Sequence, residues 1–323
     1  MSYLTTEKAQ SLISELLDEV WDSASPEREN EFEQYMKVSN MARGEFTNYQ
    51  VAGFGMPNER EILEDVDYDE PLFGAKQTIV PLNWGRGFRV AEETIEDLKD
   101  AGPWDGVNQD RLTQYGEYTA ALKMKCFERV DLECALKLVN GAATTSRYVG
   151  RDSLGLFSAT HSTLDNPPLT QSNLSTGASL TANNLFNAVT AIDTQRDDRS
   201  DFISTNKTYK LIHGPSLRRQ AIEILKTTGE VGTANNTVNA VMSIPGVKII
   251  SVEVKNLDRA NGASYTGWFV TNESAHQIHW KWRLKPAFAK NVDFDAVAMK
   301  YRARFRGVHF HKDWRGAVGY PSS

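Results

Sequence analysis

Two histidines and an aspartate near the end of the chain have the residue types and spacing of metal ligands. His309 and His311 are two positions apart, and Asp313 follows at the same interval. On a β-strand, residues two apart share one face, and imidazole and carboxylate groups both bind zinc. No further ligand follows at a characteristic spacing. We therefore expect two partly exposed strand histidines, and we keep a metal-dependent hydrolase as an alternative function of another class.

A second set, Ser158, His161 and Asp165, supplies the residue types of a nucleophile, a base and an orienting acid. All three fall within the short segment LFSATHSTLD. The partners of a catalytic triad normally converge from separate elements of a fold, so we interpret the segment as structural. The motifs GxSxG, GxxxxGK[ST], HExxH and GxGxxG are absent from the sequence. We predict no enzyme, with no catalytic, cofactor-binding or metal residues and no cofactor.

The two cysteines, Cys126 and Cys134, lie in a segment with helical periodicity. Eight positions of helix would place them about 12 Å apart along the axis, which is too far for a disulfide. The chain has no CxxC pair that would indicate a zinc site. We expect two buried thiols.

The histidines belong to the second of two segments with strict alternation. Apolar residues occupy Ile278, Trp280, Trp282 and Leu284, and then Val297, Met299, Tyr301, Ala303 and Phe305, with basic residues between most of them. This pattern predicts two half-buried strands that pair with each other. The apolar parity changes at Gly307, which predicts a β-bulge or bend there. Because aromatic and basic side chains fall on opposite faces, we do not expect a stacking platform for single-stranded nucleic acid, although a nucleic-acid-binding protein stays open.

The remaining elements indicate a mixed α+β protein. Helical periodicity is found over residues 5–21, 27–38, 107–140, 181–196 and 215–227, and strand patterns over 208–213, 247–254 and 265–271. From Gly44 to about Arg89, glycine, proline, asparagine and aspartate separate single hydrophobic residues, apart from a β-rich piece at 77–82. A segment this weakly apolar cannot bury its own core, so we predict an extended arm and loop that is either disordered or ordered by a partner chain.

Length and charge limit the possible functions further. A chain of 323 residues exceeds the usual size of one hydrophobic core, and no stretch is apolar enough to cross a bilayer. The first ten residues carry no secretion signal, so we expect assembly in the cytoplasm. Residues 1–70 hold 17 acidic and 5 basic residues, whereas residues 276–323 hold 3 and 10. This asymmetry suits head-to-tail contacts between copies, and equally two differently charged faces of a monomer.

The order of these elements resembles the Hong Kong 97 capsid fold of tailed-bacteriophage major capsid proteins. The stretches LFSATHS, LTANNLFNAVTAI and YKLIHGPSLRRQAIEIL are similar to those of many such proteins, including Mu-type head subunits. The strand GWFVTNE and the final HKDWRGAV add to the likeness, which covers nearly the whole chain from about residue 40. The resemblance implies the α+β Hong Kong 97 phage capsid fold. It implies these divisions: N-terminal arm 1–44, E-loop 45–90, peripheral domain 91–169 with a spine helix at 107–140, axial domain 170–274, and peripheral-domain C-terminal strands 275–323.

The resemblance also implies a function and partners. The chain would be a major capsid protein that self-assembles into pentamers and hexamers of an icosahedral shell enclosing double-stranded DNA. Its partners would be further copies, a portal protein, scaffolding and decoration (cement) proteins, and DNA held by non-specific contact, with no membrane. It would be assembled in the host cytoplasm and reside in the virion. An encapsulin-like nanocompartment shell is the alternative within this fold. Lys76 is the only lysine in the E-loop range and hence the candidate for crosslinking. We expect removal of residues 1–40 to leave a soluble fold but impair particle formation.

Overall fold

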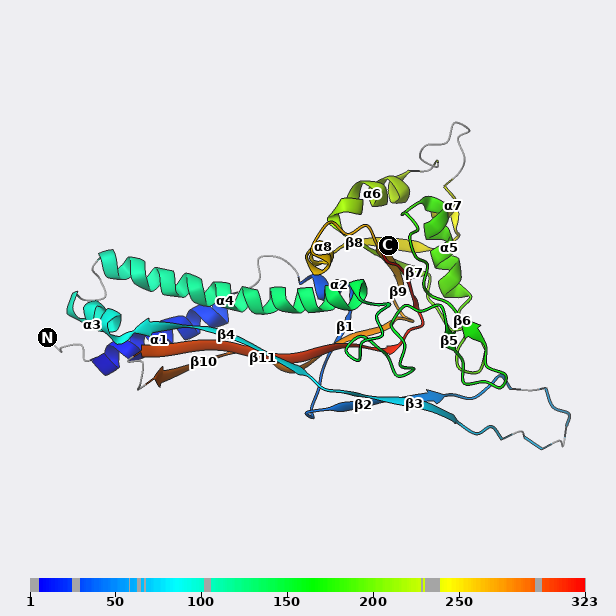
Figure 1. Ribbon diagram of the computed structural model, residues 1–323, viewed down its shortest axis with the longest axis horizontal. Coiled ribbons are helices and arrows are strands. Elements are labelled where there is room, and N and C mark those ends of the chain that lie inside the picture. The colour runs from blue at the N-terminus through cyan, green and yellow to red at the C-terminus, as the bar shows by residue number, and fades with distance from the viewer. Residues whose placement is uncertain are drawn as a thin grey trace.

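The structure is a computed structural model that describes residues 6–24, 30–57, 59–62, 65–66, 68–101, 106–227, 229, 239–293 and 298–322. It has an elongated part, a more compact part beside one end of it, and a two-stranded hairpin that extends from the base of the molecule (Figure 1). The helices are α1 (Thr6–Ser23), α2 (Glu31–Tyr35), α3 (Glu92–Ala101), α4 (Gly106–Val139), α5 (Ala182–Asp193), a 3₁₀ turn (Pro215–Leu217), α6 (Arg218–Lys226), α7 (Ala240–Ser243) and α8 (Asn256–Asn261). The strands are β1 (Lys37–Asn40), β2 (Phe46–Ala52), β3 (Leu72–Ile79), β4 (Leu82–Ala91), β5 (His161–Ser162), β6 (Thr170–Gln171), β7 (Thr208–His213), β8 (Lys248–Glu253), β9 (Trp268–Asn272), β10 (Gln277–Asp293), β11 (Ala298–Asp313) and β12 (Ala317–Tyr320).

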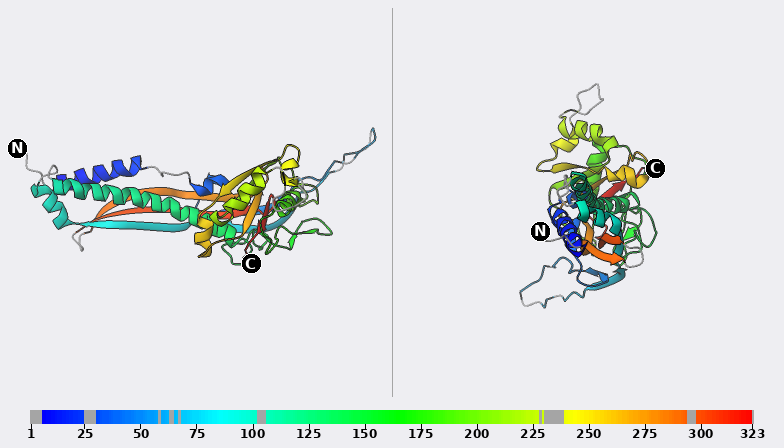
Figure 2. Two further views of the ribbon diagram at one scale, coloured as in Figure 1. Left: turned by 90° about the horizontal axis from the view of Figure 1, so that it is seen from above. Right: turned by 90° about the vertical axis from the view of Figure 1, so that its left-hand side faces the viewer.

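A long sheet and a long helix form the elongated part. The sheet has the order β1-β10-β11-β4, and α4 runs along one side of it with α1 next to α4 (Figures 1 and 2). The predicted pairing of the two alternating strands is confirmed, because β10 and β11 pair antiparallel along nearly their whole length. The aromatic residues predicted to face the core are buried, among them Trp280, Trp282, Tyr301 and Phe305. The helix predicted at 107–140 is α4, which lies over these side chains.

The bulge lies on a different strand from the one predicted. Trp282 pairs with Gly307, and the next pair is Leu284 with Arg306, so the extra residue is Arg283 of β10. Gly307 is needed for close packing at this point. A Cβ atom there would lie 2.4 Å from Cζ2 of Trp280. The Trp280 ring therefore packs against β11 at Gly307. The extra residue of the bulge lies on the paired strand, β10.

The N-terminal segment is part of the subunit core. Leu17 of α1 and Phe32 of α2 are fully buried, and Tyr35 is nearly so. The Phe32 backbone N–H donates to Asp131 of α4 at 2.9 Å, and β1 pairs parallel with β10. This packing argues against the expectation that residues 1–40 can be removed without loss of the fold, because their removal would expose the apolar face of α4.

Two predictions in the first 91 residues need correction. The helix predicted at 27–38 is reduced to α2, because β1 begins at Lys37, and residues 25–29 lie outside the described residues. The range predicted as a loop contains the β2–β3 hairpin and also β4, which pairs with β11. In β4 the residues Trp84, Phe88 and Val90 share one face, but Arg86 interrupts the alternation and hides the strand in the sequence.

The compact part holds a second sheet of order β12-β9-β7-β8, covered by α5, α6 and α7. Helix α5 begins at the cap residue Thr181, whose side chain accepts a hydrogen bond from the Asn184 N–H at 3.1 Å. The compact part has a hydrophobic core of its own, which includes Leu185, Ile192 and Trp268. The helices and strands predicted between residues 181 and 271 are confirmed within a few residues. Among the described residues, no helix is both long and apolar enough to cross a membrane.

Candidate functional site: the junction at the base of the hairpin

The two histidines considered as metal ligands are buried under α4. His309 is 3% exposed and His311 is 2% exposed, so the prediction of partly exposed strand histidines is wrong. Burial, with the charge of Lys137 nearby, holds the pKa of each imidazole well below its usual range. The carboxylate of Asp313 pairs with Arg151 at 2.7 Å and not with either histidine. The part of the chain that the structure describes contains no group of three or more histidines, cysteines or acids that could hold a metal ion.

Buried charges on α4 surround these histidines. The Nζ atom of Lys137 donates to the Tyr148 carbonyl at 2.5 Å, and burial lowers the pKa of Lys137 to about 7. The carboxylate of Glu133 is fully buried and accepts hydrogen bonds from Arg129 and Arg147. The contacts of Lys137 with Tyr148 and of Glu133 with Arg147 attach the loop after α4 to the helix. Sequence analysis missed them because isolated charged residues in a helical pattern normally face solvent.

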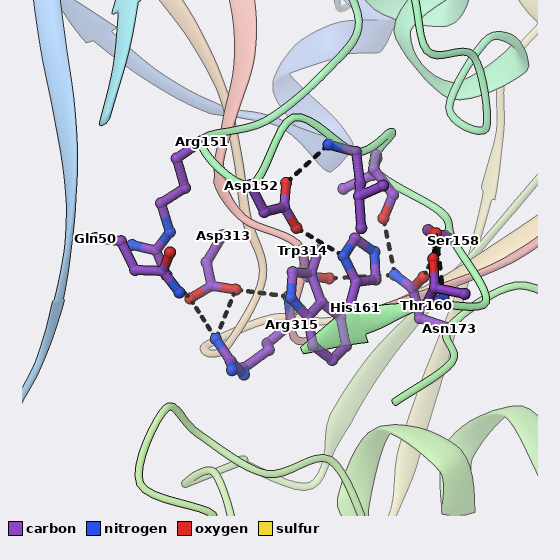
Figure 3. Close-up of polar contacts among 12 residues, drawn as sticks. Gln50, Arg151, Asp152, Ser158, Thr160, His161, Asn173, Asp313, Trp314 and Arg315 are labelled. Atoms are coloured by element: carbon purple, nitrogen blue, oxygen red, sulfur yellow. Dashed lines mark hydrogen bonds and ion pairs between the residues drawn. The ribbon is translucent and has the colours of Figure 1, made fainter. Parts of the chain in front are cut away.

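Ser158, His161 and Asp165, which the sequence led us to interpret as structural, do not form a triad. The Nδ1 atom of His161 lies 2.7 Å from a carboxylate oxygen of Asp152, and its ring stacks on Trp314 with the centroids 4.3 Å apart (Figure 3). Asp165 instead accepts a hydrogen bond from the backbone N–H of Asn166 at 3.0 Å. The acid that orients His161 is therefore Asp152, from a separate turn of the chain.

The serine of this set takes part in a network of backbone contacts. The Ser158 hydroxyl accepts a hydrogen bond from the Thr160 N–H at 3.2 Å, and the Ser158 N–H donates to Asn173 at 2.8 Å (Figure 3). Asn173 is buried and donates in turn to the carbonyl of Leu156 at 2.8 Å and that of Ala317 at 3.2 Å. The segment LFSATHS is thus held against β12, in agreement with its structural interpretation.

An ionic junction ties the base of the hairpin to both sheets. Arg315 pairs with Asp198 at 2.8 Å. Arg315 also pairs with Asp313 at 3.0 Å, and Arg151 shares the Asp313 carboxylate (Figure 3). From β2, the Gln50 amide donates to Asp198 at 3.0 Å. The charged groups of Arg315 and Asp198 are only 6% and 7% exposed. Charge-assisted hydrogen bonds in such a site are strong, so these residues fix the hairpin to the body.

A second contact closes the loop at the end of the hairpin. Arg199 donates from Nε to the Gly53 carbonyl at 3.1 Å and from Nη2 to the Glu70 carbonyl at 2.5 Å. It also pairs with Asp69 at 2.9 Å, and Asp69 accepts from the Gly55 N–H at 2.8 Å. The Gly55 hydrogen bond is the main reason why the pKa of Asp69 lies below its usual range. Sequence analysis missed Arg199, although the charged run RDDRSD at 196–201 was a visible signal of a polar junction.

The hairpin and its loop carry large apolar side chains that are exposed in the described part of the single chain. The largest exposed fractions are those of Phe54 (79%), Ile62 (95%), Tyr68 (95%) and Phe73 (76%). Neighbouring exposed apolar residues on one projecting element usually mark a protein–protein contact. This feature agrees with the prediction that the segment packs against another chain.

Comparison with solved structures defines the class of protein. The capsid of cyanophage P-SCSP1u matches with a TM-score of 0.54 and 13% identity, over 93% of this chain and 90% of that one. The mature capsid of bacteriophage PhiM1 matches with a TM-score of 0.52 and 11% identity, over 89% and 85%. These similarities show the fold of a phage capsid subunit and confirm the predicted Hong Kong 97-like class.

The sequence comparison then gives the family. The sequence model of the phage capsid protein family matches residues 75–319, which is more than half of the chain. The chain therefore belongs to the phage capsid protein family, and it is a structural shell subunit of a tailed-phage head. No curated protein sequence matches it. The match favours a phage capsid over a nanocompartment shell, a metal-dependent hydrolase or a nucleic-acid-binding protein.

Proposed function

We propose that the subunit forms pentamers and hexamers and that these close into an icosahedral shell around double-stranded DNA. The observation that carries this proposal is the projecting β2–β3 hairpin. Its base is fixed by the junction around Asp198, and its exposed Phe54 and Phe73 have no cover in the single chain. A rigid element with uncovered apolar side chains gains stability only against another subunit, and a shell supplies one on every side.

The divisions of the chain would then have separate roles. The long helix α4 would act as the spine of a peripheral domain made of residues 91–169 and the strands within 275–323. Residues 170–274 would form an axial domain that meets its copies around each local symmetry axis. Residues 45–90 would form the E-loop, which lies across a neighbour, except that β4 belongs to the sheet of its own subunit. Residues 1–44 would form the N-terminal arm, and α1 and α2 anchor it to the same subunit.

Further partners and the site of assembly are part of the proposal. A portal protein, scaffolding proteins and decoration (cement) proteins would contact the shell, DNA would be held by non-specific contact, and assembly would take place in the host cytoplasm. The role would be structural and without catalysis. Lys76 is exposed on β3, where a neighbouring subunit could approach it, so it is the residue to examine for crosslinking.

Cryo-electron microscopy of particles formed by the full chain tests this function. The chain is expressed both alone and together with the neighbouring head genes, so that any scaffolding protein needed for assembly is supplied. The expected result is closed shells in which fivefold and sixfold clusters of subunits are resolved and each hairpin contacts a neighbour. Particles that form only open tubes or sheets, or shells in which the hairpin contacts its own subunit alone, would contradict the proposal.

A further inference from the structure

Two buried histidines of β11 are covered by the loop 140–155, which follows α4. The ring of His309 stacks on Tyr148 of this loop, with the ring centroids 5.5 Å apart. A Cβ atom at Gly150 would lie only 2.3 Å from Nε2 of His311, so the His311 ring packs directly on the loop backbone. Both imidazoles therefore belong to the surface against which the loop is held.

Neither ring has a hydrogen-bond partner in the described part of the chain. Both nitrogens of His309 and both nitrogens of His311 are buried without one. His213, in the second sheet, shows the usual arrangement of a buried histidine. Its Nδ1 lies 2.8 Å from the Gly214 carbonyl oxygen and its Nε2 lies 2.8 Å from the Ser251 hydroxyl. Buried polar groups without partners are uncommon and costly, so two of them on one strand call for a functional explanation.

The charged groups around the two rings oppose a proton on either of them. The titratable and charged groups that face the pair come from α4 (Glu133 and Lys137), the loop (Arg147, Tyr148, Arg151 and Asp152), β5 (His161) and β11 itself (Asp313). The residues of β10 that pair with the two histidines, Ile278 and Trp280, are apolar. Each acid in the set already has a basic partner, and the Glu133 oxygen nearest to His309 lies 3.9 Å from its Nε2. A proton on either ring would therefore find no free counter-charge among the described residues.

The same loop is attached to the base of the hairpin. The Gln77 amide of β3 donates a hydrogen bond to the Val149 carbonyl at 2.7 Å. Arg151 donates to the Tyr49 carbonyl of β2 at 3.5 Å and lies close to Gln50 of the same strand (Figure 3). The loop therefore contacts the histidine pair on one side and the hairpin on the other, and a loop that leaves β11 gives up both sets of contacts.

Acid acts on this arrangement through the difference between a packed loop and a displaced loop. Under the packed loop, burial and the charge of Lys137 hold the pKa of both histidines well below its usual range. With the loop displaced, the rings reach water and regain a pKa of about 6.5, so below that pH protons bind only the open form and favour it. From pH 7 to pH 5 the open fraction therefore rises by about 25-fold for each histidine. Burial lowers the pKa of Lys137 to about 7, so below pH 7 it is charged in both forms and adds little to this change.

We propose that His309 and His311 form an acid-sensitive latch, which holds the loop 140–155 on β11 while both rings are neutral and releases it when they take up protons. Release also removes the contacts that the loop makes with Gln77 and Tyr49 at the base of the hairpin. The latch lies within one subunit, so the proposal goes beyond the shell function and does not depend on it. A fall in pH thus acts on the attachment of the hairpin without a charged group on the hairpin itself.

Hydrogen–deuterium exchange of the full chain at pH 7, 6 and 5 tests the latch, with rates corrected for the intrinsic pH dependence of amide exchange. In the wild type, the amides of residues 141–155 are expected to lose protection by about 25-fold or more between pH 7 and pH 5. The variant His309→Phe with His311→Leu keeps apolar packing but removes both titrating rings, so its loop protection should not change over this range. His213→Gln is the matched control, because it removes a buried histidine of the other sheet, and its loop should respond to pH like that of the wild type.

Either of two results overturns the latch. One is a wild-type loop whose protection is the same at pH 7 and pH 5, and the other is a double variant that loses protection as steeply as the wild type. Exchange in β7 and β9, measured in the same experiment, shows whether each variant is folded. If the double variant does not fold, the single substitutions decide, because each should remove about one factor of 25 from the wild-type change and an undiminished change would refute the role of that ring.

Discussion

Replacement of Asp198 by alanine would remove the centre of the ionic junction. Its carboxylate accepts hydrogen bonds from the buried Arg315 at 2.8 Å and from Gln50 at 3.0 Å. Removing one partner of a buried ion pair typically costs 3–5 kcal/mol, because the other charge is left uncompensated. Arg315 keeps its second partner, Asp313, at 3.0 Å. We therefore expect Asp198→Ala to lower the free energy of unfolding by about 2–3 kcal/mol.

The assay is urea denaturation of the unassembled subunit, with unfolding monitored by tryptophan fluorescence. The free energy is taken from the transition midpoint and the slope of its dependence on urea concentration. Asp165→Ala is the matched control. It removes an acid of the same type, whose carboxylate bonds to the adjacent Asn166 N–H, and should cost less than about 0.5 kcal/mol. If Asp198→Ala costs no more than this control, the junction does not stabilise the base of the hairpin.

Three further predictions concern single residues of the core. Burial, reinforced by Lys37, lowers the pKa of His276 to about 3. Below the unfolded-state pKa of about 6.5 only the unfolded state binds the proton, so stability falls as the pH is lowered, by about 2 kcal/mol at pH 5. Because the other buried histidines also lose stability on acidification, the urea midpoints of the wild type should fall further between pH 7 and pH 5 than those of His276→Leu, by about this amount, and parallel pH profiles would contradict it. Gly307→Ala should cost about 1–3 kcal/mol in the same assay, because its Cβ would lie 2.4 Å from the Trp280 ring, whereas an unchanged midpoint would show that the ring can move aside. Burial raises the pKa of the Cys134 thiol, so mass spectrometry should find it alkylated by iodoacetamide at pH 8 only in urea; modification of the folded chain would disprove its burial.

The long strands were the most predictable part of the fold. Alternation of Trp280 and Trp282 with basic residues specified which face of β10 is buried, and the same held for Tyr301 and Phe305 of β11. Each strand lies between a helical layer and solvent over most of its length. In that setting the period of two in the sequence corresponds directly to burial.

Alternation failed where both faces of a strand are covered. His309 and His311 lie under α4, while Phe310 between them is covered by Phe46 of the hairpin. The polarity of a residue shows which face it prefers, but it does not show whether a distant segment returns to cover that face. Strand β4 was missed for a related reason, since Arg86 occupies the apolar side of an otherwise regular pattern.

The candidate site was the least predictable part. Arg315 lies 117 positions from Asp198, and Arg199 lies 146 positions from Gly53. Such pairs depend on the relative position of two sheets and a hairpin, which local periodicity does not determine. His161 illustrates the same limit, because its partner Asp152 lies nine positions away in a separate turn, which no local pattern indicated. Local patterns located these polar residues in the sequence, but only the fold identified their partners.

The central claim, that this chain builds a shell from copies of itself, is tested most directly by the size of what it forms. Sedimentation velocity and negative-stain electron microscopy of the purified full chain, alone and with head-gene neighbours, measure that size over a range of concentration and salt. We predict closed shells or rings of subunits that grow at the expense of slowly sedimenting material as concentration rises. A stable monomer or dimer under every condition would contradict the account.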